Sequence, residues 1–347
     1  MQAVTSRPLP MALFALASLL PLALFGAGVV CGGWWAVAGL VYMTGFAACL
    51  DQISGWFQGD AAEGAEFPAA DALLVAVALG ALGLMPVAVW AVAGASGLSV
   101  GGQLAVFAGT GLWLGQVANP AAHELIHRPS RGLFRLGALV YCWLLFGHHT
   151  SAHRLVHHRH AASAQDPNTA RSGEGYYAFL LRAWGGSFRR GWAAEDALRA
   201  KGKTGLHPYA IYIGMALVCL GLGFAIAGVW GALVWGALAV HAQCQLMLSD
   251  YVQHYGLVRA VRADGRLEPV SVRHSWNAPH WFSSAFMLNA PRHSDHHAHP
   301  ARPYPALSLP GREEAPMLPW PLPAACMIAL CPPLWKRAIR PHLKPWL

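Results

Sequence analysis

The chain has 347 residues, of which 55% are hydrophobic and only 12% charged, and it carries a formal net charge of +8 at pH 7. A typical soluble domain has about 25% charged residues, so this composition argues against a soluble protein and indicates an integral membrane protein. The positive charge is confined to one part of the chain. We therefore attribute it to membrane topology and expect no nucleic acid as a partner.

Six apolar stretches have about the length, roughly 20 residues, that a helix needs to cross the hydrocarbon core of a bilayer. The first is longer than the apolar part of a signal peptide, roughly 7–15 residues, and another follows at once, so we interpret it as a span. The stretches cover residues of about 9–30, 31–50, 71–93, 98–118, 208–227 and 229–249. The expected fold is all-α, a polytopic membrane protein with six transmembrane helices.

The basic residues indicate how these spans are oriented. Of the 24 Lys and Arg residues, one is Arg7 and the other 23 lie from Arg128 onward, outside the spans. The positive-inside rule places such residues in the cytoplasm, and six spans keep both termini there. We expect a multi-pass protein of the inner (cytoplasmic) membrane, a single domain from end to end, with a helical cytoplasmic cap made of 119–207 and 250–347. The acidic segment 51–70 has no Lys or Arg but should lie on the same side.

The seven cysteines are scattered, mostly within apolar stretches, and no CxxC pair occurs. This pattern predicts reduced thiols that serve the structure. The histidines are far more informative, because 18 of them occur and half fall into clusters at the cytoplasmic boundary of the spans.

The clustered histidines have the spacing of metal ligands. In "HELIHR", His123 and His127 stand four residues apart, which places both rings on one face of a helix. The same spacing recurs in "HRLVHH" and "HSDHH", and a further histidine stands alone in "DYVQHYGL". The predicted ligands are His123, His127, His153, His157, His158, His254, His293, His296 and His297. Nine imidazoles exceed what one tetrahedral zinc ion can use, and they favour two metal ions.

Other readings of the histidines are weaker. HExxH is also the motif of zinc proteases, but a protease does not need six further clustered histidines. A metal transporter would place its ligands near the middle of the membrane, where only His241 lies. We interpret the isolated histidines as ordinary polar or capping residues and leave those that flank the clusters unassigned. The two sets are His207, His241 and His342, and His148, His149, His160 and His299.

The ordered set of motifs resembles the membrane alkane monooxygenases of the integral-membrane fatty-acid desaturase/hydroxylase superfamily. "HELIHR" is similar to the first histidine box of that family, and "AHRLVHHRHAASAQDPNTAR" is similar to its second box, which includes Asp166 and Pro167. "DYVQHYGL" and "RHSDHHAHPARPY" resemble the two later boxes. The resemblance extends over about residues 100–340.

The resemblance implies two non-haem iron ions held by the nine histidines. It further implies hydroxylation of terminal C–H bonds in alkanes or similar apolar molecules, with O2 as oxidant and with substrate that reaches the site through membrane lipid. The chain has no flavin, haem or GxGxxG motif. Electrons are therefore expected from a separate protein, in this family a rubredoxin-like carrier with its reductase. Glu124 and Asp295 lie inside the boxes, and we expect their carboxylates to anchor ring N–H groups of the ligands.

Two positions depart from the family pattern. Ala152 and Gln253 each precede a predicted ligand, where the family usually has glutamate. Loss of these carboxylates removes groups that could orient imidazoles or tune the metals. An alkylaromatic side-chain hydroxylase and a fatty-acid or lipid desaturase, both with the same di-iron site, therefore remain alternatives to an alkane hydroxylase.

Overall fold

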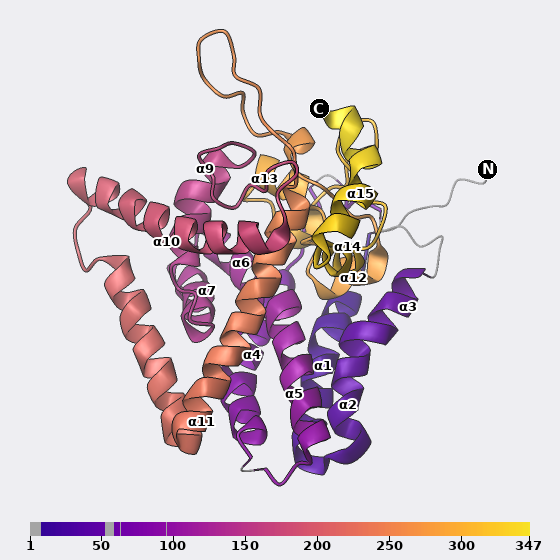
Figure 1. Ribbon diagram of the computed structural model, residues 1–347, viewed down its shortest axis with the longest axis vertical. Helices are drawn as coiled ribbons and strands as arrows, with labels where there is room; N and C mark the ends of the chain where they lie inside the picture. The colour runs from indigo at the N-terminus through magenta and orange to yellow at the C-terminus, as the bar shows by residue number, and fades with distance from the viewer. Residues whose placement is uncertain (1–7, 53–58, 63, 95) are drawn as a thin grey trace.

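The computed structural model describes residues 8–52, 59–62, 64–94 and 96–347. The described residues form helices, turns and loops with no named strand, and isolated bridges join Val261 with Leu267 and Asn277 with Met317. The all-α prediction is confirmed. Figure 1 shows a bundle of long helices with shorter helices and loops packed over one end, which we call the capped end.

Within the described residues, four helices are long and apolar enough to cross a membrane. The first three agree with the predicted spans 9–30, 31–50 and 71–93. The four are α1 (Met11–Cys31); the continuous helix Gly33–Gln52, made of α2 (Gly33–Val41), the π-helix η1 (Tyr42–Phe46) and α3 (Ala47–Gln52); α4 (Ala70–Val92); and α11 (Pro208–Gln253).

The helix α11 is in fact two arms that meet at a tight reversal and diverge from it toward the capped end in a V (Figure 1). Ala227 and Gly228 leave helical geometry, and Gly228 has a φ of +59°, which glycine adopts without steric cost. The arms approach so closely that a Cβ atom on Gly231 would clash with the carbonyl oxygen of Gly223. The arms correspond to the predicted spans 208–227 and 229–249.

The remaining predicted span, 98–118, belongs to a longer continuous helix. It consists of α5 (Val100–Trp113), the π-helix η2 (Leu114–Ala118) and α6 (Asn119–His127). Ser99 caps its start, because the Ser99 Oγ accepts a hydrogen bond from the backbone N of Gly102 at 3.2 Å. The first histidine box therefore stands at the end of the same rod. The number of six membrane crossings stays a prediction.

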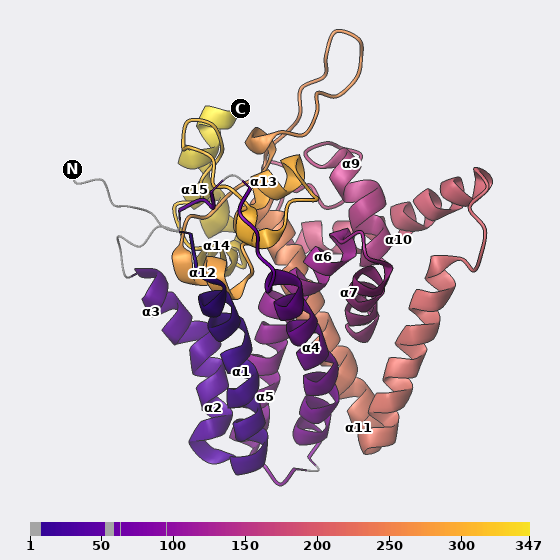
Figure 2. The same ribbon diagram turned by 180° about the vertical axis from the view of Figure 1, so that it is seen from behind.

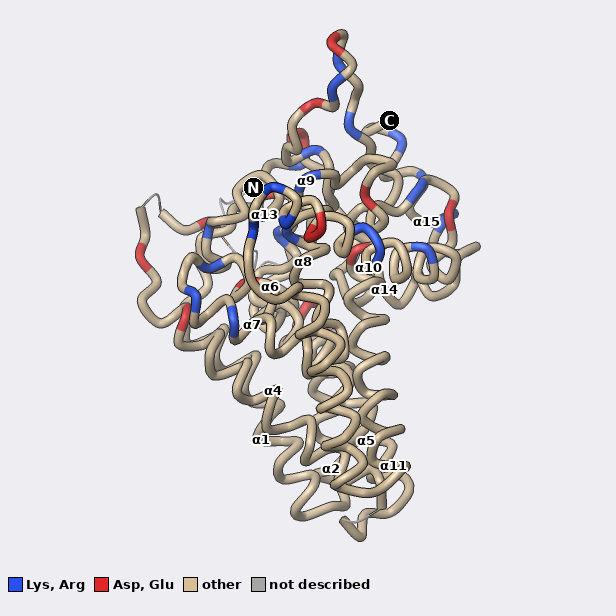
Figure 3. The backbone as a smooth tube through the Cα atoms, turned by 90° about the vertical axis from the view of Figure 1, so that its left-hand side faces the viewer, with Lys and Arg blue, Asp and Glu red and all other residues tan. Residues whose placement is uncertain are grey.

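The capped end holds the shorter helices. Among them, α10 runs across the ends of the long helices (Figure 1), and its outer part projects from the bundle in the view from behind (Figure 2). They are α7 (Arg131–Trp143), α8 (His149–Ala152), the π-helix η3 (His153–His157), α9 (His158–His160), α10 (Tyr176–Ala200), α12 (Trp281–Phe286), α13 (His293–Ala298), α14 (Leu322–Ala329) and α15 (Pro332–Leu343). Figure 3 shows that the charged residues gather at this end, whereas the long helices below it are almost free of them.

Described parts of the acidic segment 51–70 also contact the capped end. The Asp51 carboxylate accepts hydrogen bonds from the backbone N atoms of Phe282 and Ser283, both at 3.0 Å. Asp60 forms an ion pair with Arg292, one residue before α13. These contacts place Asp51 and Asp60 on the same side as the histidine boxes, which is the side that the sequence predicted for this segment.

Candidate metal centre

The nine predicted histidines, far apart in sequence, come together at the capped end in two groups. Within each group, one ring nitrogen of every histidine lies within 4.8 Å of those of the others. The first group is His123, His127, His153, His158 and His296, and the second is His157, His254, His293 and His297. The two groups adjoin, since the ring centroids of His158 and His297 are 4.8 Å apart.

Separate helices contribute to this arrangement from different directions. The helix α6 supplies two members of the first group, α11 ends beside His254 of the second, and α13 supplies members of both. His157 and His158 are neighbours in sequence but belong to different groups. The side chains of adjacent residues on a helix point about 100° apart. A single helical turn that lies between the two groups can therefore supply one ligand to each.

The ring nitrogens are spaced like ligands around an ion. In the second group the Nε2 atom of His293 lies 2.9 Å from that of His254 and 3.1 Å from that of His297. In the first group the Nε2 atoms of His153 and His158 are 2.8 Å apart. Metal–nitrogen bonds of roughly 2.1 Å place neighbouring ligands of a crowded shell about 3 Å apart. The spacing therefore fits a metal ion in each group.

The protonation of these rings also suits metal binding. Burial lowers the pKa of His127 to about 3 and that of His254 to about 3, so both rings are neutral at physiological pH. The buried Nε2 atoms of His123 and His127 have no hydrogen-bond partner among the described residues. A metal ion binds the unprotonated nitrogen of a neutral imidazole. Rings that are neutral and face one another are therefore a suitable set of ligands for metals that bind imidazole.

His157 is oriented by a carboxylate that the sequence analysis named only as part of a motif. Its Nδ1 atom lies 2.8 Å from Oδ2 of Asp166, and both side chains are buried. Burial alone would lower the pKa of His157, but the neighbouring Asp166 raises it. When the Nδ1–H donates to Asp166, the Nε2 atom is left with a lone pair that points into the second group.

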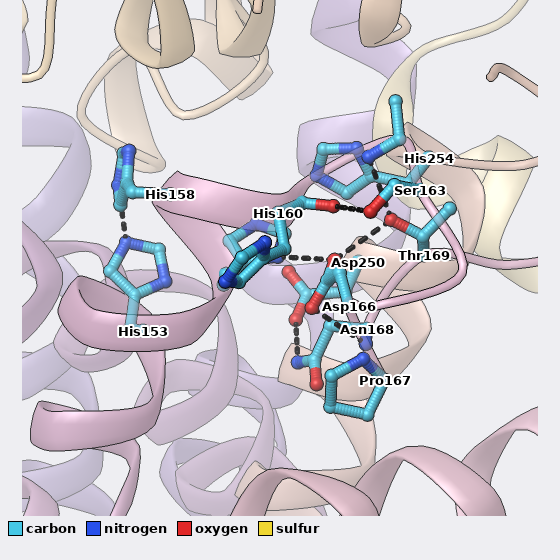
Figure 4. A network of polar contacts seen from close by, with 12 residues as sticks. His153, His158, His160, Ser163, Asp166, Pro167, Asn168, Thr169, Asp250 and His254 are labelled. Carbon is cyan, nitrogen blue, oxygen red and sulfur yellow. Dashed lines mark hydrogen bonds and ion pairs between the residues drawn. The ribbon is translucent and has the colours of Figure 1, made fainter. Parts of the chain in front are cut away.

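Asp166 is itself held in place by its own loop and by α11. It accepts hydrogen bonds from Thr169 Oγ1 at 2.8 Å and from the backbone N of Asn168 at 3.0 Å. The Asn168 side chain donates in turn to Asp250 at 2.7 Å (Figure 4). The Asp–Pro motif therefore links the second histidine box to the end of α11.

Glu124, which the sequence predicted as an anchor, lies between two members of the first group. Its Oε1 atom is 4.0 Å from Nδ1 of His123 and 3.9 Å from Nδ1 of His296, beyond the length of a direct hydrogen bond. Its Oε2 atom accepts from the backbone N of Tyr304 at 3.1 Å. Burial raises the pKa of Glu124 to about 7, although Arg128 opposes this effect.

Asp295, the other predicted anchor, has different partners. It accepts hydrogen bonds from Arg302 Nη1, at 2.7 and 2.6 Å, and from the backbone N of Ser308 at 2.8 Å. It also forms a hydrogen bond of 2.9 Å with the ring Nδ1 of His299, which lies outside both groups. Asp295 therefore ties the end of α13 to the following loop, and within the described residues it hydrogen-bonds none of the nine predicted ligands.

A cavity of about 850 Å³ leads from the histidines into the long helices. His123, His153, His293 and His296 line one end of it. Its wall is largely apolar, with side chains such as Leu112, and is formed by the segment 43–52, the rod of α5 and α6, α10, α11 and α14. The unassigned His149 also lines it, with its ring stacked on Phe146. An apolar molecule dissolved in the bilayer could reach the histidines through this space.

Comparison with known proteins agrees with this geometry. The fatty acid desaturase family matches residues 98–324. The chain is 30% identical over 321 residues to alkane 1-monooxygenase 2 of Pseudomonas aeruginosa, which covers 89% of this chain and 84% of the relative. Alkane 1-monooxygenase 1 of the same species is also 30% identical, over 90% of this chain and 84% of its own. The xylene/toluene monooxygenase hydroxylase component XylM of Pseudomonas putida is 28% identical over 67% and 63% of the two chains.

The long apolar helices and the two histidine groups define a multi-pass membrane protein with a metal-binding centre at one end of its bundle. The chain belongs to the fatty acid desaturase family, and within it to the branch of the alkane 1-monooxygenases. It is an oxidoreductase, a membrane monooxygenase of this superfamily. An apolar substrate, O2 and a membrane setting follow from that relationship.

Proposed function

We propose that the protein is a single-domain di-iron monooxygenase of the inner membrane that hydroxylates terminal C–H bonds of alkane-like molecules. One observation carries the proposal. Nine histidines form adjoining groups of five and four at the end of a largely apolar cavity of about 850 Å³. A protease or a metal transporter needs neither this number of ligands nor the cavity that ends at them.

The nine histidines would hold one iron ion in each group, and imidazole ligands suit iron. When bound, the two ions would supply the capacity to reduce O2 with two electrons. The overall reaction consumes substrate, O2, two electrons and two protons and yields the alcohol and water. The chain's own contribution is to keep eight of the nine rings neutral by burial, to orient His157 through Asp166, and to hold Glu124 beside the first group.

The cavity would bind the substrate and exclude water from the reacting carbon. Because His293 and His296 line it together with apolar side chains, a methyl group that enters from the membrane would come to rest beside both groups. Binding of an apolar chain in such a space removes apolar surface from water or lipid and holds the chain in one orientation.

The electrons would come from a rubredoxin-like carrier and its reductase. The sequence has no flavin, haem or GxGxxG motif. Arginines of α10 and of the loop 259–273 lie at the capped end and would attract an acidic carrier. This placement requires the capped end to face the cytoplasm, as the positive-inside rule predicts.

Hydroxylation of an alkylaromatic side chain is the second candidate, because the chain is 28% identical to a xylene/toluene monooxygenase component. A desaturase with the same metal centre is the third, since the family match is to fatty acid desaturases. The three reactions share the metal centre and differ in the substrate that the cavity accepts and in the product that leaves.

Product analysis separates these candidates. Cells that express the protein with a rubredoxin and its reductase receive octane, hexadecane, p-xylene or a fatty acid. We expect 1-alkanols, and about two iron ions per purified chain. A His123→Ala, His293→Ala double variant, impaired in both groups, is the control and should give no product. Stoichiometric zinc, with no product after iron is reconstituted, would overturn the proposal.

A further inference from the structure

The second arm of α11 forms part of the cavity wall, and a row of polar side chains runs along it. His241, Gln245, Ser249 and Gln253 follow one another at intervals of four residues, and all four line the cavity. Residues four apart lie on one face of a helix. Polar side chains are costly within a span and are usually retained for function. A plain alkane has no group that could use them.

Gln116 of the π-helix η2 joins this line through a pair of amides. Its Nε2 atom donates to Oε1 of Gln245 at 3.0 Å. The Nε2 atom of Gln245 donates to the carbonyl oxygen of Gly111 at 2.8 Å, and a carbonyl can only accept. This contact fixes the orientation of both amides. The Oε1 atom of Gln116 is left as an acceptor with no hydrogen-bond partner among the described residues.

Two more side chains of the lining have unused hydrogen-bonding atoms nearby. Nδ1 of His241 and Oδ1 of Asn119 are buried, and neither has a partner in the described part of the chain. The ring of His241 is stacked on Phe107, with centroids 5.9 Å apart, and the Asn119 amide donates to the carbonyl of Ala242 at 3.1 Å. Both side chains are therefore held in place, and the two atoms without a partner are covered by the surrounding chain, since Nδ1 of His241 faces the backbone of Gly111.

This polar region lies at a defined depth below the metal centre. Gln116 precedes His123 by seven residues on the continuous helix of α5, η2 and α6. Gln245 lies on α11 and precedes His254, which follows the end of that helix, by nine residues. At 1.5 Å per residue, these separations are about 10 Å and about 13 Å along the helix axes. A chain of medium length would reach from one region to the other.

The charge of the lining limits what the polar region can bind. Of the described residues that line the cavity, none is Lys or Arg. A carboxylate would have no cation beside it there, and an unpaired charge is very costly in such surroundings. A neutral group that both donates and accepts a hydrogen bond suits the polar side chains of this wall, the Gln116–Gln245 pair and His241.

We propose that the preferred substrate is an apolar chain with a neutral hydrogen-bonding group at one end, a primary alcohol in the simplest case. The Gln116–Gln245 pair and His241 hold that group, and the opposite end is hydroxylated. This inference rests on the proposed monooxygenase function. An alcohol of this kind, O2, two electrons from the carrier and two protons give a diol and water.

Two measurements test the inference. The first is the ratio of kcat/KM for 1-dodecanol to that for dodecane. The second needs no turnover: it is the rise in the melting temperature of the iron-loaded protein, without reductant, in dodecanol, dodecane or dodecanoate. The variants are Gln116→Leu and His241→Phe, which keep bulk and remove hydrogen bonds. Gln243→Leu is the matched control, because Gln243 lies on the same arm but does not line the cavity.

We expect dodecanol to be preferred over dodecane, and dodecanoate to stabilise the protein least. Gln116→Leu should lower the ratio of kcat/KM for dodecanol to that for dodecane about fivefold, which is the effect of losing one neutral hydrogen bond. It should also reduce the rise in melting temperature caused by dodecanol but not the rise caused by dodecane. Gln243→Leu should change neither. Unchanged ratios and shifts in both variants would overturn the inference while leaving the proposed function intact. If the protein oxidised neither compound, the proposed function would fail, and the melting shifts would still decide the inference.

Discussion

The Nδ1 atom of His157 and the Oδ2 atom of Asp166 lie 2.8 Å apart in a pair that is buried on both sides. The pair ties the Asp–Pro loop to the second histidine group. Because a neutral imidazole has one proton, the proton that Asp166 accepts leaves the other nitrogen free to bind a metal.

Asp166→Asn should therefore weaken metal binding in the second group. The amide NH2 of the new side chain could donate to Nδ1 of His157 and stabilise the wrong tautomer. Loss of such a carboxylate partner typically costs roughly 10–100-fold in metal affinity or activity. The measurement is iron retained against increasing chelator, together with product formation. Asp264→Asn is the control, because Asp264 lies in an exposed loop and its carboxylate accepts from the backbone N of Arg266. Equal iron retention in the two variants would contradict the assigned role.

His254→Ala tests the one predicted ligand that stands alone in its motif. Its Nε2 atom lies 2.9 Å from that of His293 in the second group. The variant should retain at most about one iron per chain and lose hydroxylation, while still inserting in the membrane. His342→Ala is the control, because His342 stands outside the motifs and its side chain is exposed. Two irons and normal turnover in the His254→Ala protein would remove His254 from the ligand set.

The metal-free protein should lose stability as the pH falls from 7 to 5. Burial lowers the pKa of His127 and His254 to about 3, well below the 6.5 of an ordinary histidine. Between these values the unfolded chain binds more protons than the folded one, so acid favours unfolding.

The carboxyl group of Glu124 acts in the opposite sense, because burial raises its pKa to about 7. The histidines should dominate by number, since burial also lowers the pKa of six others. Melting of the metal-free protein in detergent at several pH values provides the measurement. A melting temperature that stays constant or rises as the pH falls from 7 to 5 would show that the histidines do not dominate the pH dependence of stability.

Labelling of introduced cysteines tests the orientation. Cys31, Cys49 and Cys331 are exposed and are first replaced by serine. A thiol at Arg266, in the loop at the capped end, should be inaccessible to an impermeant maleimide in intact cells. A thiol at Ser99, at the opposite end of the bundle, should react. The reverse pattern would place the histidines outside the cytoplasm.

Much of the fold follows from hydropathy and spacing. The apolar stretches predicted the long helices within a few residues, because an apolar helix in lipid must satisfy its backbone internally. The reversal at Gly228 fell where the sequence separated two spans. The continuity of α5, η2 and α6 was not predicted, since the polar motif "HELIHR" suggested that the span ended at residue 118.

The candidate site was predictable in membership but not in arrangement. Spacing of three and four residues selected histidines that share a helix face, and the structure brings all nine together. The spacing could not assign His157 and His158 to different groups, because that division depends on how η3 packs relative to α13. Nor could it show that Asp166 contacts a ligand ring while Asp295 contacts Arg302. Such contacts depend on loop conformations that have no periodic signal.

The short helix α13 contributes His296 to one group and His293 and His297 to the other. A six-residue helix moves as one body, so an ion that fixes it through His296 also orders the two rings that face the second ion. The conformational entropy of α13 is then lost when the first ion binds, and binding of the second ion does not have to lose it again. We expect the protein with its full set of ligands to take up the ions cooperatively, with few chains that contain only one.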